Sequence, residues 1–126
     1  MNYENLDKFG QILITQVRDV VIDRFVQKFA GGYKDQESQI NAVVYQSLDE
    51  NTQKFVSKIV KEVIDSTLHE LLFMVEQNEE IEVVVKNGGE VTNIKENIDG
   101  LCGELYTEDG WIEKYSKHDP SRKIVL

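Results

Sequence analysis

One histidine of this chain lies where its neighbours could give it a chemical role. His69 is inside the apolar run DSTLHELLFMVE, residues 65–76. Side chains three and four residues apart are neighbours on a helix, so Glu62, Asp65 and His69 would share one strip of it. Two carboxylates and an imidazole can hold a divalent metal, or an acid can orient the imidazole as a base. A small helical metal-binding protein or hydrolase that uses these three residues is therefore one hypothesis.

The same strip also has a purely structural interpretation, in which His69 pairs with Asp65 at the edge of a core helix. The helical zinc-protease pattern is absent, because Phe73 stands where its second histidine belongs. A mononuclear site would need a third ligand from elsewhere, and His118 is the only other histidine. The structural interpretation is favoured, no cofactor is expected, and the metal site stays an alternative.

Other motifs for ion or phosphate chemistry are incomplete. Acid pairs such as Glu76 with Glu79 resemble those with which all-helical nucleotide pyrophosphohydrolases hold magnesium, yet such pairs arise readily in an acidic chain. An EF-hand loop aligned on Gly100 would start at Lys95 and so lacks its first ligand. No phosphate loop or catalytic triad is evident. Cys102, the single cysteine, has acids nearby that disfavour its thiolate, so these features argue against an enzyme.

The net charge of −9 is unevenly distributed. Residues 1–75 carry −3, residues 76–109 carry −8 from ten acids and two bases, and residues 110–126 carry +2. An acidic surface repels phosphate backbones, so nucleic acid is not expected as a partner. The longest apolar run, 71–75, is far shorter than the ~20 residues that cross a bilayer. The start of the chain lacks a secretory-signal pattern and one cysteine permits no internal disulfide, so a cytoplasmic protein without membrane contact is expected.

The acidic segment is the strongest candidate for function because it also contains aromatic residues. Tyrosine and tryptophan flanked by acids suit the capture of a basic protein surface, as in small acidic immunity proteins and antitoxins that neutralise nucleases. The same aromatic residues could instead cap the core. The candidate binding residues are Glu90, Glu96, Asp99, Glu104, Tyr106, Glu108, Asp109 and Trp111. We therefore hypothesise a protein-interaction module, without catalytic residues, that binds a basic partner through this face.

Three helices are predicted to position these residues. Apolar side chains recur at steps of three and four from Leu6 to Phe29, and again from Phe55 to Val75. A shorter helix over 36–48 lies between these two long ones. The residues on its apolar face are Ile40, Val43, Val44 and Leu48. The apolar face of the first helix is wide, which favours cover from more than one side and makes a homodimer through that helix a further hypothesis.

Beyond residue 78 the pattern becomes β-like. The segments IEVVVK (81–86) and VTNI (91–94) flank NGGE, and Asn-Gly favours a tight turn because both central residues accept positive φ. A hairpin over 81–94 is predicted. Residues 106–115 could form a short helix or a second hairpin, and the apolar end 124–126 could add a strand. The expected fold is one globular domain, 1–126, of the α+β class and mainly α, with three N-terminal helices (two long, one shorter) and a small C-terminal β-hairpin and short-helix region.

Overall fold

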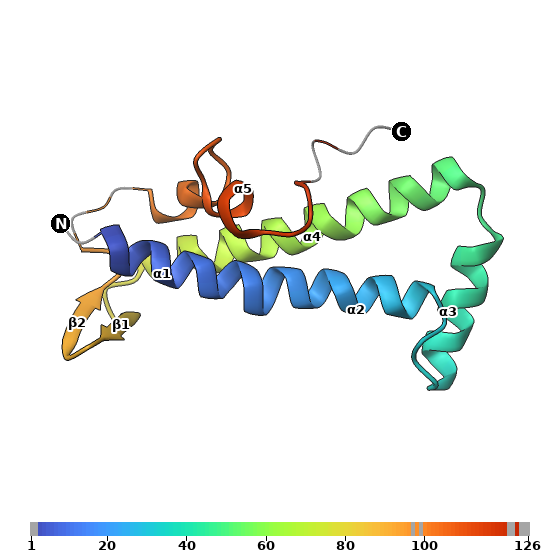
Figure 1. Ribbon diagram of the computed structural model, residues 1–126, viewed down its shortest axis with the longest axis horizontal. Coiled ribbons are helices and arrows are strands. Elements are labelled where there is room, and N and C mark those ends of the chain that lie inside the picture. Colours follow the sequence, from blue (N-terminus) through green and yellow to red (C-terminus); the bar gives the residue numbers. More distant parts are fainter. Residues whose placement is uncertain (1–2, 97, 99, 121–122, 124–126) are drawn as a thin grey trace.

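The computed structural model describes residues 3–96, 98, 100–120 and 123, and it confirms a mainly helical α+β fold. The helices and strands, in chain order, are α1 (Tyr3–Leu13), the π-helical turn η1 (Ile14–Arg18), α2 (Asp19–Phe29), α3 (Gln36–Ser47), α4 (Glu50–Gln77), β1 (Val84–Asn87), β2 (Glu90–Asn93), the 3-10 helix η2 (Leu101–Leu105) and α5 (Trp111–Tyr115). The first three form one long helix, which lies beside α4, with α3 across one end (Figure 1). No helix among the described residues is long and apolar enough to cross a membrane.

The second and third of the predicted helices, α3 and α4, each begin at an aspartate. Asp35 and Asp49 are the N-caps of α3 and α4, and their carboxylates accept hydrogen bonds from the backbone N–H groups of Ser38 and Thr52 at 3.0 and 2.8 Å. Such a cap satisfies a donor that the first turn of a helix leaves unpaired. After α2, the chain turns at Gly31, whose φ of 83° is cheap only for glycine. The predicted helix boundaries follow from this capping chemistry.

The hairpin is shorter than the predicted range 81–94. Val84 pairs with Asn93 and Asn87 pairs with Glu90, so the two central residues of the turn are Gly88 and Gly89, with φ of 59° and 90°. The glycine pair, rather than Asn-Gly, therefore supplies the positive φ angles of the turn. Buried Asn5 fastens the hairpin to α1, because its side chain donates to Thr92 Oγ1 at 2.8 Å and accepts from Asn87 Nδ2 at 3.0 Å.

The segment after the hairpin is helical where it is regular. Residues 101–105 form η2 and residues 111–115 form α5, which decides between the two interpretations of 106–115 in favour of a short helix. The strand considered for 124–126 lies outside the described residues. Both short helices pack on the long ones, with η2 against α4 and α5 against α1 and η1. The C-terminal segment thus completes the core instead of extending the sheet.

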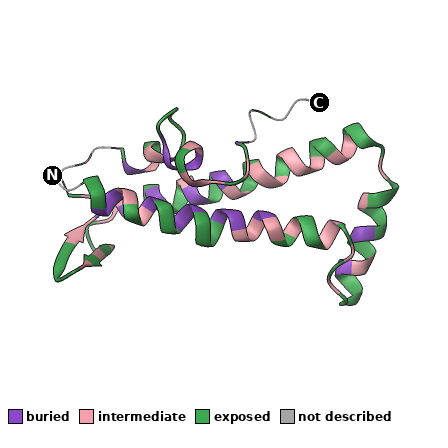
Figure 2. Cartoon of the chain, viewed as in Figure 1, coloured by how far each residue is buried: buried purple, intermediate pink, exposed green. Residues whose placement is uncertain are grey.

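The core lies at the end of the molecule that the C-terminal segment covers (Figure 2). Its buried residues are Leu6, Leu13 and Ile14 from the first helix, Leu68, Leu72 and Val75 from α4, and Ile94, Leu101, Leu105, Trp111 and Ile112 from the C-terminal segment. Trp111 is 1% exposed and stands edge-on to Phe9, with ring centroids 5.9 Å apart. A Cβ atom on Gly10 would lie 2.3 Å from the indole ring, so glycine at this position lets the tryptophan contact the helix backbone.

The other end of the molecule has almost no core of its own. Among residues 23–64, Ser38 and Ala42 are the only buried ones, and none of the large apolar side chains is buried (Figure 2). The apolar face predicted for the shorter helix is turned to solvent: Ile40, Val43 and Val44 are exposed. Periodicity identified that face correctly, but nothing among the described residues covers it.

Candidate functional site

The acidic segment predicted as a binding surface surrounds the end of the molecule where α4 finishes and α1 begins (Figure 1). Exposed acids whose carboxylates have no hydrogen bond or ion pair among the described residues are Glu79, Glu80, Glu82, Glu96, Glu108 and Asp109. Most acids of the helical part, by contrast, form ion pairs or helix caps. Unneutralised negative charge is therefore concentrated in this segment. Of the other predicted acids, Glu90 is exposed, Glu104 is half-buried and Asp99 lies outside the described residues.

One of the two lysines in this segment is committed to the backbone. Lys95 Nζ donates to the carbonyl oxygens of Val75, Asn78 and Ile81 at 3.1, 2.8 and 2.6 Å. The last carbonyls of a helix lack partners within it and carry partial negative charge, which a lysine can satisfy. The positive charge of Lys95 thus holds the end of α4 and is not directed at the neighbouring acids.

The two predicted aromatic contact residues have different environments. Tyr106 is 39% exposed, and its hydroxyl donates to the carbonyl oxygen of Asp65 at 3.0 Å, so the ring is held in place while part of it faces solvent. Burial raises the pKa of the Tyr106 hydroxyl, and the nearby Asp65 carboxylate raises it further. Trp111 is enclosed in the core. A buried indole offers no surface to a partner, so Trp111 is removed from the proposed contact set and Tyr106 is kept.

The three residues of the alternative metal site do not converge. Both carboxylate oxygens of Asp65 receive hydrogen bonds from Arg18, at 2.6 and 3.2 Å, and Glu62 is exposed on α4. Among the described residues no group of three His, Cys, Asp or Glu side chains is arranged to hold a metal ion. A carboxylate saturated by a guanidinium is a poor ligand for a cation, because the positive charge already beside it would repel the metal. The hydrolase hypothesis therefore has no supporting geometry.

The predicted pairing of His69 with Asp65 is also wrong. Arg18 occupies Asp65, while the His69 ring lies beside Tyr106 with ring centroids 5.7 Å apart. His69 Nδ1 is buried and has no hydrogen-bond partner among the described residues. The prediction failed because it considered only neighbours on the same helix. A guanidinium from another helix that donates to both carboxylate oxygens binds Asp65 more tightly than an imidazole one turn away.

A buried polar cluster is centred on Arg18, which sequence analysis did not identify. Its side chain is fully buried. Besides Asp65, it contacts the C-terminal segment through Nη1, which donates to Ser116 Oγ at 2.7 Å and to the His118 carbonyl oxygen at 3.0 Å. A buried guanidinium is tolerated only when its donors are satisfied in this way. Arg18 therefore joins three parts of the chain that are distant in sequence: η1, α4 and the C-terminal segment.

A π-helical turn carries this arginine. In η1 the N–H of Asp19 bonds to the carbonyl of Ile14, five residues earlier, instead of four. The wider turn changes the direction of the residues that follow along the helix. One sequence signal could have revealed Arg18: it stands midway between Ile14 and Ile22, at steps of four, on the buried face. An arginine at an apolar position of the helical period is thus a candidate for a buried ion pair.

Neighbouring residues fasten the C-terminal segment to α2. Ser116 Oγ donates to Asp19 Oδ1 at 2.6 Å, and the Lys117 N–H donates to Asp19 Oδ2 at 3.1 Å. One turn further along α2, Asp23 lies 2.8 Å from His118 Nε2 and 2.7 Å from Lys117 Nζ. Ser116 therefore has partners on every side and is not a free nucleophile. Together these contacts hold the C-terminal segment to the first helix. We call the group the clasp; its residues are Arg18, Asp19, Asp23, Asp65, Ser116, Lys117 and His118.

The clasp gives a prediction for pH. Hydrogen bonds from Lys117 and His118 hold the pKa of the Asp23 carboxyl below its usual value. Such a group stabilises the fold above its unfolded-state pKa of ~3.9, and that contribution is lost as the pH falls through the folded-state pKa. Because Asp23 is partly exposed, we expect Asp23→Asn to cost less than about 1 kcal/mol at neutral pH. Urea titrations should show the difference in unfolding free energy between Asp23→Asn and the wild type shrinking as the pH falls below the unfolded-state pKa of ~3.9; a constant difference would contradict this.

Comparison of the chain with protein-family models, curated proteins and solved structures gives no match. The function must therefore be inferred from the chemistry of the described residues. Arg18 and Asp65 are buried and bonded to each other. In the acidic segment, the exposed acids and the partly exposed ring of Tyr106 are groups that a second molecule could reach.

Proposed function

We propose that this protein is a non-catalytic protein-interaction module, of the immunity-protein or antitoxin kind, whose acidic segment, residues 76–109, binds a basic partner protein. The observation that carries the proposal is the set of exposed carboxylates in this segment that have no partner among the described residues. The helical part neutralises most of its own acids by ion pairs and caps, whereas this segment leaves its acids open.

Electrostatics gives such a surface a definite role in binding. Exposed acids steer a basic protein toward the surface and raise the association rate, while the affinity comes from groups that lose their water in the contact. Tyr106 supplies such a group beside Glu108 and Asp109: its ring is partly exposed, and its hydroxyl is already held by the Asp65 carbonyl. A ring fixed before binding loses little conformational entropy when the partner arrives.

Binding to a panel of purified small basic proteins, nucleases among them, tests the proposal. We expect at least one to bind the wild type, with an affinity that falls steeply between ~0.1 and ~1 M salt as the Debye length shrinks from ~10 to ~3 Å. The variant Glu108→Gln/Asp109→Asn should bind about tenfold more weakly at the lower salt, which corresponds to about 1.4 kcal/mol.

The matched control is Glu37→Gln/Glu50→Gln, which removes the same charge from exposed acids of α3 and the start of α4, at the opposite end of the molecule (Figure 1). It should bind like the wild type. An equal loss in both variants would mean that net charge alone attracts the basic proteins. That result, or salt-independent binding, would contradict a specific acidic surface.

A further inference from the structure

Buried apolar side chains are unevenly distributed between the two ends of the molecule. The buried residues that form the core all lie outside residues 24–61, which we call the outer lobe; it contains α3 and the adjoining parts of α2 and α4 (Figure 1). Within the outer lobe Ala42 is the one apolar residue that is buried, while Val26, Val43 and Phe55 are 58, 69 and 48% exposed. Because burial of apolar surface is the main favourable term in folding, the outer lobe has little to stabilise it.

The face of α4 that points inward changes from apolar to polar where the helix enters the outer lobe. In the core this face carries Leu68, Leu72 and Val75. Two and three turns before Leu68, the same face carries Lys61 and Ser57. Burial lowers the pKa of the Lys61 amine, and the charge of Arg18 lowers it further. The closed fold therefore disfavours the charge of Lys61, which would regain water if the outer lobe opened.

The two long helices do not fill the space between them in the outer lobe. A cavity of about 40 Å³ lies between α2 and α4. Side chains next to an unfilled space lack partner atoms on that side and lose part of their packing energy. The walls of the cavity are formed by Ile22, Phe25, Val26 and Phe29 on α2 and by Ser57, Val60 and Lys61 on α4.

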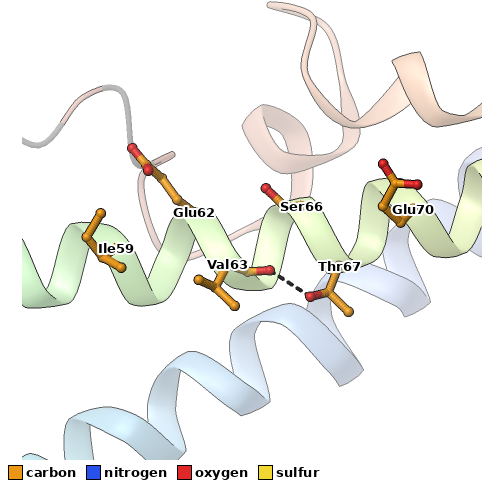
Figure 3. A pocket seen from close by; sticks show the side chains of 6 residues that line it. All are labelled: Ile59, Glu62, Val63, Ser66, Thr67 and Glu70. Carbon is orange, nitrogen blue, oxygen red and sulfur yellow. Dashed lines mark hydrogen bonds between the residues drawn. The ribbon is translucent and has the colours of Figure 1, made fainter.

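Helix α4 is also uncovered on its outward side near the same level. Ile59 and Val63 are 38 and 59% exposed there. They lie in a shallow groove that is lined by α4 alone and is open to solvent (Figure 3). The dashed bond in Figure 3, from the Thr67 hydroxyl to the Val63 carbonyl oxygen at 2.8 Å, lies within the helix and holds no second element to it.

The contacts that do hold the outer lobe together are local and lie near the surface. The rings of Phe29 and Tyr45 stack with centroids 4.2 Å apart. Gln46 Nε2 donates to the Phe29 carbonyl oxygen at 2.9 Å, and Gln53 Nε2 donates to the Tyr45 carbonyl oxygen at 3.0 Å. Hydrogen bonds within reach of water add little net stability, because water replaces them when they break.

The clasp lies at the boundary between the outer lobe and the rest of the molecule. Arg18 joins the first helix to Asp65 of α4, and Asp23 contacts His118 and Lys117. All the clasp residues lie outside residues 24–61. Opening of the outer lobe therefore breaks none of the bonds of the clasp and exposes none of the core residues of α4.

We propose that residues 24–61 open as a unit while the core and the clasp stay folded. In the open form α3 and the adjoining ends of α2 and α4 separate, and their apolar side chains become accessible together. Segments that rearrange on binding or regulation are drawn from the least stable parts of a fold. The acidic segment, residues 76–109, lies outside the outer lobe, so this inference does not rest on the proposed function.

Amide hydrogen exchange of the full chain, followed residue by residue by NMR, tests the opening. Residues 54–60 and 66–75 belong to the same helix, α4, and differ in whether they lie in the outer lobe or at the core. After correction for intrinsic rates, we expect amides 54–60 to exchange at least about tenfold faster than amides 66–75. Equal protection of the two stretches would overturn the proposal.

A pair of mild substitutions distinguishes opening of the outer lobe from unfolding of the whole domain. Ile14 is fully buried in the core, so Ile14→Val should speed exchange of amides 66–75 about threefold to tenfold. Amides 54–60 should stay within about twofold of the wild type, because the core remains folded when they exchange. Equal acceleration of both stretches would overturn the proposal.

The matched control places a similarly small change in the outer lobe. Ala42 is 3% exposed on α3, and Ala42→Gly should speed exchange of amides 54–60 about fivefold. Amides 66–75 should accelerate as well, because unfolding of the whole domain includes the outer lobe. An Ala42→Gly variant with unchanged exchange at 54–60 would show that α3 and α4 do not open together, which would also overturn the proposal.

Discussion

Replacing Arg18 with methionine is expected to lower the free energy of unfolding by about 3–5 kcal/mol, a large part of the total for a domain of this size. Stability is lost because the partners of the guanidinium remain in the core without it. Asp65 is 5% exposed, and without the guanidinium its charge would be buried and unpaired. Ser116 and the His118 carbonyl would lose the guanidinium donor as well, so the C-terminal segment would be held to α2 only through Asp19 and Asp23 among the bonds described above.

Urea unfolding of the Arg18→Met variant measures this loss of stability. Arg24→Met is the matched control, because Arg24 is an exposed arginine on the same long helix. The control should change stability by less than about 0.5 kcal/mol. The double variant Arg18→Met/Asp65→Leu should recover a large part of the loss, since it leaves no unpaired buried charge. Arg18→Lys should not, because one ammonium cannot reach both Asp65 oxygens and the C-terminal segment. Equal effects of the Arg18 and Arg24 substitutions would contradict the assignment.

Gly10→Ala is expected to destabilise the protein by about 2 kcal/mol, although the same substitution inside an exposed helix stabilises by up to about 1 kcal/mol. The sign reverses because the new methyl group would lie 2.3 Å from ring atoms of Trp111. The indole is 1% exposed and packed among other core residues. The core must shift to admit one carbon atom.

Thermal and urea unfolding of Gly10→Ala and Gly103→Ala compare the two situations. Gly103 has nothing within 4 Å of the position that a methyl group would take, so it serves as the control, with an expected change within about 0.5 kcal/mol. Combining Gly10→Ala with Trp111→Leu should cost less than the sum of the two single changes, because the smaller side chain relieves the overlap. Strict additivity, or a stabilised Gly10→Ala, would show that helix and indole do not touch.

The helices of this fold could be predicted from the sequence because their information is local. Apolar spacing of three and four identifies the long helices, and Asp35 and Asp49 mark where the later two begin. Which side of a helix is covered is not local information. Ile40, Val43 and Val44 share a face, as the spacing requires, yet that face is exposed because no other described segment of the chain reaches it.

The polar clusters were predicted less well because their partners are distant in sequence. Asp65 was assigned to the neighbouring His69, whereas its actual partner, Arg18, is 47 residues away. Trp111 resembled a contact residue among acids, and only the close approach to Gly10 places it in the core. The excess of acids, in contrast, is a compositional property, so the segment that carries it could be located from the sequence alone.

The clasp around Arg18 has a consequence for how the chain acquires its fold. Its bonds to Asp65 span 47 residues, and those to Ser116 and His118 span 98 and 100. Helices form from local contacts within microseconds. Closing a long loop costs conformational entropy before the contact it brings together can stabilise the fold, so folding is slower when such contacts are needed. The guanidinium cannot leave water until the C-terminal segment arrives. The long helices can therefore form early, while burial of Arg18 is a late step in which nearly the whole chain takes part.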